Sequence, residues 1–204
     1  MKYLQLVFVM LALVIGVKAQ QAPIDGVDAR SNPEEFTKQL NNPDAHVRLR
    51  SAEALARLAA TDQIKLVEGY RLQEKNKDVR LALDWALYRM GRSEALYRIV
   101  DELDSGRQAQ AIDYLSELES PDLLYPFLKR TKNAPRITAG LLKALARIGD
   151  AQTLELVKPY RESHEPYVAE AAEVAYDEIE KRLAEPAADV RARPRTVEKA
   201  PDKP

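Results

Sequence analysis

The stretch Lys77–Gly91, KDVRLALDWALYRMG, decides the fold, because its pattern recurs about every thirty residues along the chain. Counting from Val79 as offset 0, apolar or small residues stand at offsets 3, 4, 7, 8 and 11, and Gly91 follows. This spacing places one apolar stripe along an amphipathic helix, and glycine is typical of the position just after a helix. The stretch therefore predicts a helix that buries one face and ends before Gly91.

Four further copies of this pattern begin at Val47, Arg107, Ile137 and Val168. The copy at Arg107 is the weakest, because Gln110 takes the place of a small apolar residue. Between successive copies lie segments that begin with residues favoured at helix N-termini, namely Asp62, Ser93, Ser120 and Asp150. Each repeat is therefore predicted to be a helical hairpin.

Proline and asparagine mark further helix boundaries. Asn32 and Asn42 each precede a proline, so each is predicted to cap a helix whose first residue is that proline. Pro126 and Pro159 are expected inside the second type of helix, where a proline removes a backbone hydrogen bond and bends the axis. The array is therefore expected to curve.

A cap, then Val-Arg, then small residues alternating with leucine and a final Gly-Asp resembles the HEAT-like repeat of the phycobilisome-lyase type. The resemblance is carried by Asp44, Val47-Arg48, Asp78-Val79-Arg80 and Ala144-Leu145-Ile148-Gly149-Asp150. It implies an all-α fold, an α-solenoid of about five HEAT-like hairpins that follows a right-handed superhelix. Repeats of this family serve mainly as docking surfaces in proteins of unrelated roles, so the resemblance implies a fold rather than a reaction.

The two ends of the chain differ from the repeats. Residues 1–19 combine Lys2, an apolar run and a Val17-Lys18-Ala19 ending, which is the pattern of a cleaved secretory signal peptide. Residues 20–31 read as a flexible lead-in, residues 32–184 as the HEAT-like repeat domain, and residues 185–204 as a disordered tail rich in proline and charge. We expect a secreted or periplasmic protein of a bacterial cell envelope, with no integral membrane segment after cleavage.

Charge and composition exclude several function classes. Removal of residues 1–19 leaves 29 basic against 32 acidic residues, so the basic excess of a nucleic-acid binder is absent. The chain has no cysteine, and its two histidines, His46 and His164, are far apart in sequence. It has neither a glycine-rich phosphate loop nor a nucleophile elbow. We therefore expect no catalytic residues, no metal site and no cofactor.

Stacked hairpins align equivalent exposed positions into columns. Offset 6 of the five copies gives Glu53, Trp85, Asp113, Lys143 and Val174, and offset 10 gives Arg57, Arg89, Glu117, Arg147 and Glu178. The offset-10 column is basic in the first two repeats, mixed in the middle and acidic at the end. It predicts a groove whose charge changes from basic to acidic along the array.

Within this groove, Trp85, Tyr88 and Arg89 are of the types most enriched at binding hot spots. We predict a partner-binding site formed by these three residues together with Arg57, Arg80, Lys143 and Arg147. The alternative for Trp85 and Tyr88 is that their rings are buried at the junction between two repeats.

The leading hypothesis is a non-catalytic module, a scaffold or adaptor, that binds an unidentified protein or peptide on the concave face. One alternative is an enzyme or enzyme accessory, lyase-like or polysaccharide-acting, that uses the acidic residues of the last repeats. Another alternative is a purely structural spacer.

Overall fold

The computed structural model describes residues 32–131 and 134–184, and these residues form helices connected by turns, with no strand among them. The predicted all-α class is therefore confirmed. The expected signal peptide at 1–19, the lead-in at 20–31 and the tail at 185–204 lie outside the described residues. The α-helices run in the order α1 Pro33–Gln39, α2 Ala45–Leu58, α3 Ile64–Gln73, α4 Lys77–Arg89, α5 Ala95–Asp101, α6 Gln108–Leu115, α7 Tyr125–Arg130, α8 Pro135–Ile148, α9 Ala151–Val157 and α10 Pro166–Ala184.

The five copies of the sequence pattern correspond to the even-numbered helices. Val47, Val79, Ile137 and Val168 lie in the first turns of α2, α4, α8 and α10, and Arg107 directly precedes α6. Short 3₁₀ turns join some neighbours, at Thr61–Gln63, Glu102–Asp104, Pro121–Leu124 and Lys158–Tyr160.

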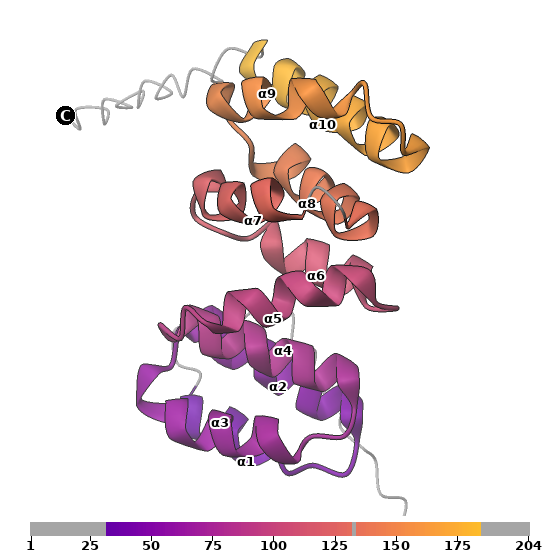
Figure 1. Cartoon of the computed structure of the whole chain (residues 1–204). Coiled ribbons are helices and arrows are strands. Elements are labelled where there is room, and N and C mark those ends of the chain that lie inside the picture. The colour runs from indigo at the N-terminus through magenta and orange to yellow at the C-terminus, as the bar shows by residue number, and fades with distance from the viewer. Residues whose placement is uncertain (1–31, 132–133, 185–204) are drawn as a thin grey trace, which may run out of the picture. The chain divides into compact units, whose positions relative to one another are not determined.

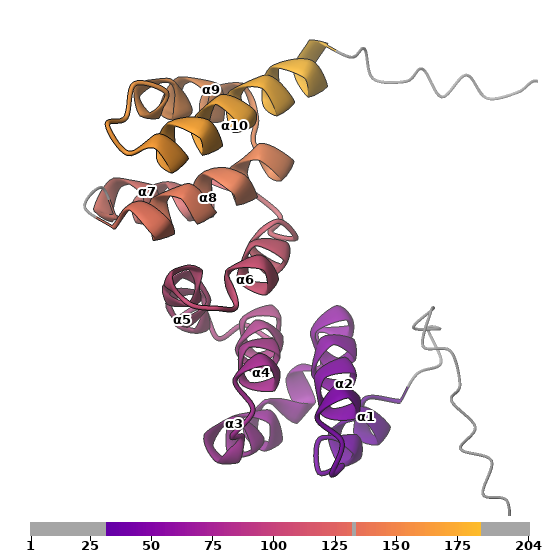
Figure 2. The same cartoon turned by 90° about the vertical axis from the view of Figure 1, so that its right-hand side faces the viewer.

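The even-numbered helices pack on one another in chain order, α2 on α4, α4 on α6, α6 on α8 and α8 on α10 (Figure 1). The odd-numbered helices α1, α3, α7 and α9 each pack beside the even-numbered helix that follows them, while α5 contacts α4, α6 and α8 (Figure 2). The α2–α4 and α8–α10 junctions are extensive, whereas the α4–α6 junction is small. The apolar stripes supply the core, with Leu55, Leu87, Leu115, Leu145 and Ala175 completely or almost completely buried.

Two of the six predicted helix caps are confirmed, at Asn32 and Asp150. The predictions for Asp62 and Ser93 are wrong, because α3 and α5 begin one residue later, after Gln63 and Glu94. Ser120 precedes a 3₁₀ turn but forms no capping hydrogen bond with it. Asn32 accepts a hydrogen bond from the Glu34 backbone N–H, and Asp150 forms a capping box with Thr153. Asn42 does not cap α2, because Asp44 does so and Asn42 instead accepts from the Asp44 backbone N–H. Two nested turns thus replace the single predicted cap.

Pro126 and Pro159 lie inside continuous helical runs, residues 121–130 and 151–160, near the points where each run changes between 3₁₀ and α geometry. Pro126 is the second residue of α7, and Pro159 lies in the 3₁₀ turn that follows α9. Pro126 removes no α-helical hydrogen bond, because the N–H groups of a first helical turn have no partner within the helix. Pro159 cannot donate the next hydrogen bond of α9, and α9 ends two residues before it, at Val157. The curvature expected from these prolines stays a prediction.

Helices α2 and α4 end in the same left-handed backbone conformation. Gly91, the second residue after α4, has φ of 101°, and Ala59, its equivalent 32 residues earlier, has φ of 46°. Glycine adopts this conformation without steric cost, whereas alanine does so at a cost of about 1 kcal/mol or more. The role predicted for Gly91 is confirmed.

Buried ion pairs fix the odd-numbered helices to the first even-numbered ones. Asp84 of α4 is 4% exposed and accepts hydrogen bonds from Arg71 of α3 and Arg98 of α5. Arg48 of α2 binds the Glu74 carboxylate through two nitrogens, at 2.7 and 3.0 Å, and its hydrogen bonds lower the pKa of Glu74. These ion pairs join α4 to α3 and α5, and they join α2 to Glu74 at the end of α3.

Candidate functional site

Each of the ten residues of the two predicted columns lines at least one of three hollows, to which α2, α4, α6, α8 and α10 contribute. We call this surface the even-helix face. The Tyr88 hollow is lined by Trp85, Tyr88, Arg89, Gly91, Ser93, Glu117, Leu118, Glu119 and Leu123. The Arg57 hollow is lined by Glu53, Arg57, Trp85, Gln110, Asp113, Tyr114 and Glu117. The Lys143 hollow is lined by Ala109, Ile112, Asp113, Lys143, Ala146, Arg147, Val174, Glu178 and Arg182.

The three hollows are neighbours because they share walls. Trp85 and Glu117 line both the Tyr88 hollow and the Arg57 hollow, and Asp113 lines both the Arg57 hollow and the Lys143 hollow. With the open solvent at their mouths included, the volumes are about 610 Å³ for the Tyr88 hollow, 700 Å³ for the Arg57 hollow and 1210 Å³ for the Lys143 hollow. The face therefore offers a connected series of open depressions rather than one enclosed cavity.

Trp85 occupies the small junction between α4 and α6. Its ring stacks on Tyr114 of α6, with centroids 5.5 Å apart and planes at 3°, and on Tyr88, with centroids 5.6 Å apart and planes at 18°. The residue is only 2% exposed. Trp85 is therefore buried at the junction between two repeats, as the alternative interpretation of its role predicted. It also lines the Tyr88 hollow and the Arg57 hollow.

A polar network surrounds the Trp85–Tyr114 stack. The Gln110 side-chain amide donates to the Tyr114 hydroxyl at 2.9 Å and to the Asp78 backbone carbonyl at 3.1 Å. The Tyr114 hydroxyl donates to the Glu53 carboxylate at 3.0 Å. Burial raises the pKa of Tyr114 far above its ordinary value. These contacts join α2, α4 and α6 at the floor of the Arg57 hollow.

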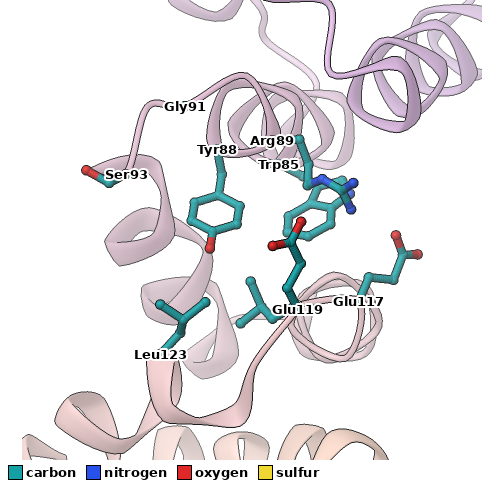
Figure 3. Close-up of a pocket in the computed structure, with 9 residues that line it drawn as sticks. Trp85, Tyr88, Arg89, Gly91, Ser93, Glu117, Glu119 and Leu123 are labelled. Carbon is teal, nitrogen blue, oxygen red and sulfur yellow. The ribbon is translucent and has the colours of Figure 1, made fainter.

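Tyr88, Arg89 and two carboxylates border the Tyr88 hollow (Figure 3). The Arg89 guanidinium carbon lies 5.5 Å from the Trp85 ring centroid, in cation–π range. Burial raises the pKa of the Tyr88 hydroxyl, and the Glu119 carboxylate adds to this rise. Glu117 and Glu119 are exposed, and neither forms an ion pair with another described residue.

The Lys143 hollow has a different lining. Ala109, Ile112, Ala146 and Val174 contribute apolar surface, and the Val174 side chain is 49% exposed. Arg147 donates to Asp113 at 2.7 Å in an exposed ion pair. Arg182 donates to the backbone carbonyls of Ala146 and Gly149, which places α10 against the end of α8.

The predicted charge gradient is wrong. Acids outnumber bases in the Tyr88 hollow and the Arg57 hollow, while bases outnumber acids in the Lys143 hollow. The two columns include only one side chain from each helix turn. Each hollow is also lined by residues outside the columns, and these residues contribute charges that the columns omit in the Tyr88 and Lys143 hollows. The side chains that change the balance are Glu119 in the Tyr88 hollow and Arg182 in the Lys143 hollow.

Six of the seven predicted binding residues lie on the even-helix face, and Arg80 lines none of its three hollows. Burial alone would raise the pKa of Glu102, but hydrogen bonds from Ser105 and Arg107 and the charges of Arg107 and Arg80 lower it.

Sequence reasoning missed Glu119, Tyr114 and Leu123 as wall residues. Tyr114 was assigned to the apolar stripe, and Glu119 and Leu123 lie outside the repeat helices, so the column argument had no signal for them.

The chemistry of the remaining polar groups is limited. Across the described part of the chain, no three His, Asp or Glu side chains lie close enough together to hold a metal ion. The acidic residues of the last repeat lie exposed on α10, and Glu173 is paired with Arg161. None of the described helices has the length and apolarity needed to cross a membrane.

Comparisons with known proteins add no family. No protein-family model and no curated protein sequence matches the chain. Among solved structures, the crystal structure of an engineered protein is similar over 73% of this chain and 79% of that chain, with 19% sequence identity and a TM-score of 0.35.

Proposed function

We propose that the protein is an exported interaction module that docks a protein or peptide on its even-helix face. The row of helices would form an α-solenoid of about five HEAT-like hairpins along a right-handed superhelical path, with the even-numbered helices on the concave side. The successive packing of α2, α4, α6, α8 and α10 supports this arrangement. Export rests on the sequence pattern of residues 1–19.

One observation carries the proposal: the ten column residues line three hollows that share Trp85, Asp113 and Glu117. A connected row of shallow hollows suits a ligand that contacts several helices at once, as an extended peptide or a protein surface does. The face combines half-buried aromatic surface with arginines at its edge, which is the composition of interface hot spots.

The catalytic alternative has weaker support. The carboxylates of the last repeat that it needs lie exposed on α10 rather than facing one another in a deep pocket. The spacer alternative predicts that no surface of the repeat domain binds a partner selectively. The proposed function therefore includes binding and no chemical step.

The test compares two variants with the same charge change on different surfaces. Arg57→Glu with Lys143→Glu alters the even-helix face, whereas Lys65→Glu with Lys129→Glu alters exposed positions on the odd-numbered helices α3 and α7. Chain 20–204 and both variants are immobilised, and proteins retained from a cell-envelope fraction are identified by mass spectrometry. Thermal unfolding confirms that all three are folded.

We expect a protein retained by the parent and by the Lys65/Lys129 variant, and lost or at least about tenfold weaker on the Arg57/Lys143 variant. Equal retention by all three proteins contradicts docking on this face. Selective loss on the Lys65/Lys129 variant instead places the binding surface on the odd-numbered helices.

A further inference from the structure

The Lys143 hollow has an apolar floor that is open to solvent. Its apolar lining comes from three helices, with Ala109 and Ile112 on α6, Ala146 on α8 and Val174 on α10. Val174 is 49% exposed, so a substantial part of an apolar side chain faces water at this hollow. An apolar group of a ligand that covers this floor removes apolar surface from water, which favours binding.

Arg182 places a fixed positive charge beside the floor. Its guanidinium donates to the Ala146 carbonyl at 3.0 Å and to the Gly149 carbonyl at 2.7 Å, at the end of α8. A guanidinium has more N–H donors than these two bonds use, so further donors remain for a ligand. Because the two bonds already order this long side chain, an anion that binds it causes a smaller loss of conformational entropy.

The charges around the hollow favour an anion. Arg147 is paired with Asp113 at 2.7 Å. Neither Lys143 nor Arg182 forms an ion pair with any residue that the structure describes, and Glu178 is the one acid of the lining that is likewise unpaired there. Two bases without a carboxylate partner therefore face one acid without a basic partner. This balance attracts a carboxylate that a ligand brings to the rim.

We propose that the Lys143 hollow binds an apolar residue of the docked peptide that stands next to an acidic one. The apolar side chain covers Val174, and the carboxylate accepts hydrogen bonds from Arg182 and Lys143. This inference rests on the proposed function, since it names the part of the ligand that enters one hollow of the even-helix face. Glu178 limits the affinity for this carboxylate by repulsion.

The experiment uses synthetic hexapeptides, acetylated and amidated, that hold leucine or alanine at the third position and glutamate or glutamine at the fourth, with alanine elsewhere. Glutamine keeps the shape of glutamate and lacks its charge. All four combinations are titrated into ¹⁵N-labelled chain 20–204. The shifts of the backbone amide resonances give the affinity and locate the site without a label on the peptide.

The variants each change one wall residue of the hollow. Lys143→Gln removes a base from the rim, Val174→Ser removes apolar surface from the floor, and Glu178→Gln removes the opposing acid. Lys181→Gln removes an exposed base of α10 that lines none of the three hollows, so it serves as the matched control. Arg182 is left in place because its bonds to α8 also support the fold. Thermal unfolding confirms that each variant is folded.

We expect the peptide with leucine and glutamate to bind with a dissociation constant of about 1 mM or lower and to shift amides of α6, α8 and α10. Replacement of either residue should weaken binding at least about threefold. Lys143→Gln and Val174→Ser should each weaken this peptide by a similar factor. Glu178→Gln should strengthen it, and Lys181→Gln should leave it unchanged. Raised salt should reduce the advantage of glutamate over glutamine.

Absence of saturable binding, or equal affinity for all four peptides, overturns the inference. The docking function still stands in that case if an envelope partner is lost on the Arg57/Lys143 variant. Unchanged affinity in both Lys143→Gln and Val174→Ser also overturns it, because the peptide then binds elsewhere. Selective peptide binding without any envelope partner supports the preference of the hollow and contradicts the docking function.

Two other occupants give distinct results. The chain itself places an acidic residue next to an apolar one at Asp189-Val190, after α10. If Asp189→Asn combined with Val190→Ser strengthens peptide binding at least about tenfold, the hollow belongs to the chain's own C-terminal segment and the inference is overturned. A dimer in sedimentation equilibrium that Lys143→Gln dissociates would instead assign the hollow to a second copy of the chain.

Discussion

The part of the even-helix face formed by α2, α4 and α6 differs from the part formed by α8 and α10 in how its helices are joined. In the first part, the α4–α6 junction depends on the Trp85–Tyr114 stack and the hydrogen bonds of Gln110 and Glu53. In the second part, α8 and α10 pack mainly through apolar and small side chains, with Gly149 close against Ile179, and Arg182 adds hydrogen bonds to two backbone carbonyls at the end of α8. The same repeat pattern thus supports a polar, aromatic junction in one place and an apolar junction in another.

This difference explains where ligand chemistry is found. An aromatic and polar junction places carboxylates and hydroxyls beside the hollows, whereas a mainly apolar junction buries its contacts. The hollows beside Trp85 are accordingly acidic and rich in hydrogen-bonding groups, and the Lys143 hollow has an apolar floor with a basic rim.

Among the substitutions that compare the two parts of the even-helix face, replacement of Trp85 should lower the free energy of unfolding most. Trp85→Ala is expected to lower the free energy of unfolding by about 3–5 kcal/mol, because it removes a buried ring and leaves Tyr88 and Tyr114 without a stacking partner. Val174→Ala, at the same repeat offset on α10, should cost less than about 1 kcal/mol because Val174 is half exposed. Urea unfolding of both variants measures the difference. Equal losses would show that the α4–α6 junction does not depend on the ring.

Replacement of the buried Asp84 carboxylate should cause the second-largest loss of stability. Asp84→Asn leaves Arg71 and Arg98 without their shared anion, and we expect a loss of about 2–4 kcal/mol, moderated by the partial exposure of both arginines. Asp113→Asn breaks the exposed pair with Arg147 and should cost no more than about 1 kcal/mol. The check is chemical denaturation of the two variants at low and high salt. A loss in Asp113→Asn as large as that in Asp84→Asn would contradict this ranking.

The close packing at Gly140 of α8 provides a third test. A Cβ atom there would lie 2.8 Å from Leu103 Cδ2 and 3.2 Å from Leu103 Cβ, so Gly140→Ala is expected to cost about 1–3 kcal/mol. Gly69 lies inside α3 with open space around it, and Gly69→Ala should raise stability by up to about 1 kcal/mol through helix propensity. Thermal unfolding of the two variants measures the expected loss of stability in Gly140→Ala and the expected gain in Gly69→Ala. A neutral Gly140→Ala would mean that Leu103 moves aside freely.

The smallest effect, about 1 kcal/mol at pH 7, is expected from Tyr114→Phe, which removes the hydroxyl between Gln110 and Glu53. Because burial raises the folded-state pKa of Tyr114, the fold keeps this hydroxyl neutral. The contribution is therefore full below the unfolded-state pKa of about 10 and falls by about 1.4 kcal/mol per pH unit above it. The stability difference between parent and variant should shrink and then reverse between pH 9 and 11. A constant difference over that range would contradict a neutral, buried Tyr114.

The sequence predicted those features that depend on nearby residues. The apolar stripe of α4, the cap at Asn32, the capping box at Asp150 and the left-handed Gly91 all involve residues within a few positions of one another. Periodicity also predicted the two columns, because residues at equal offsets on helices packed in chain order share one face. The caps at Asn42, Asp62 and Ser93 were misassigned by one or two residues, since the exact start of a helix depends on the turn that precedes it.

The sequence by itself therefore determined the all-helical repeat, its period and the face on which the columns lie. Only the tertiary structure decided that Trp85 stacks on Tyr114, that Asp84 joins Arg71 to Arg98, and that Glu119 turns the charge of the Tyr88 hollow negative. These partners come from different helices and turns. Their meeting depends on how far each helix is rotated and shifted against the next, which is set by the packing of whole side chains and not by the order of residues along any one helix.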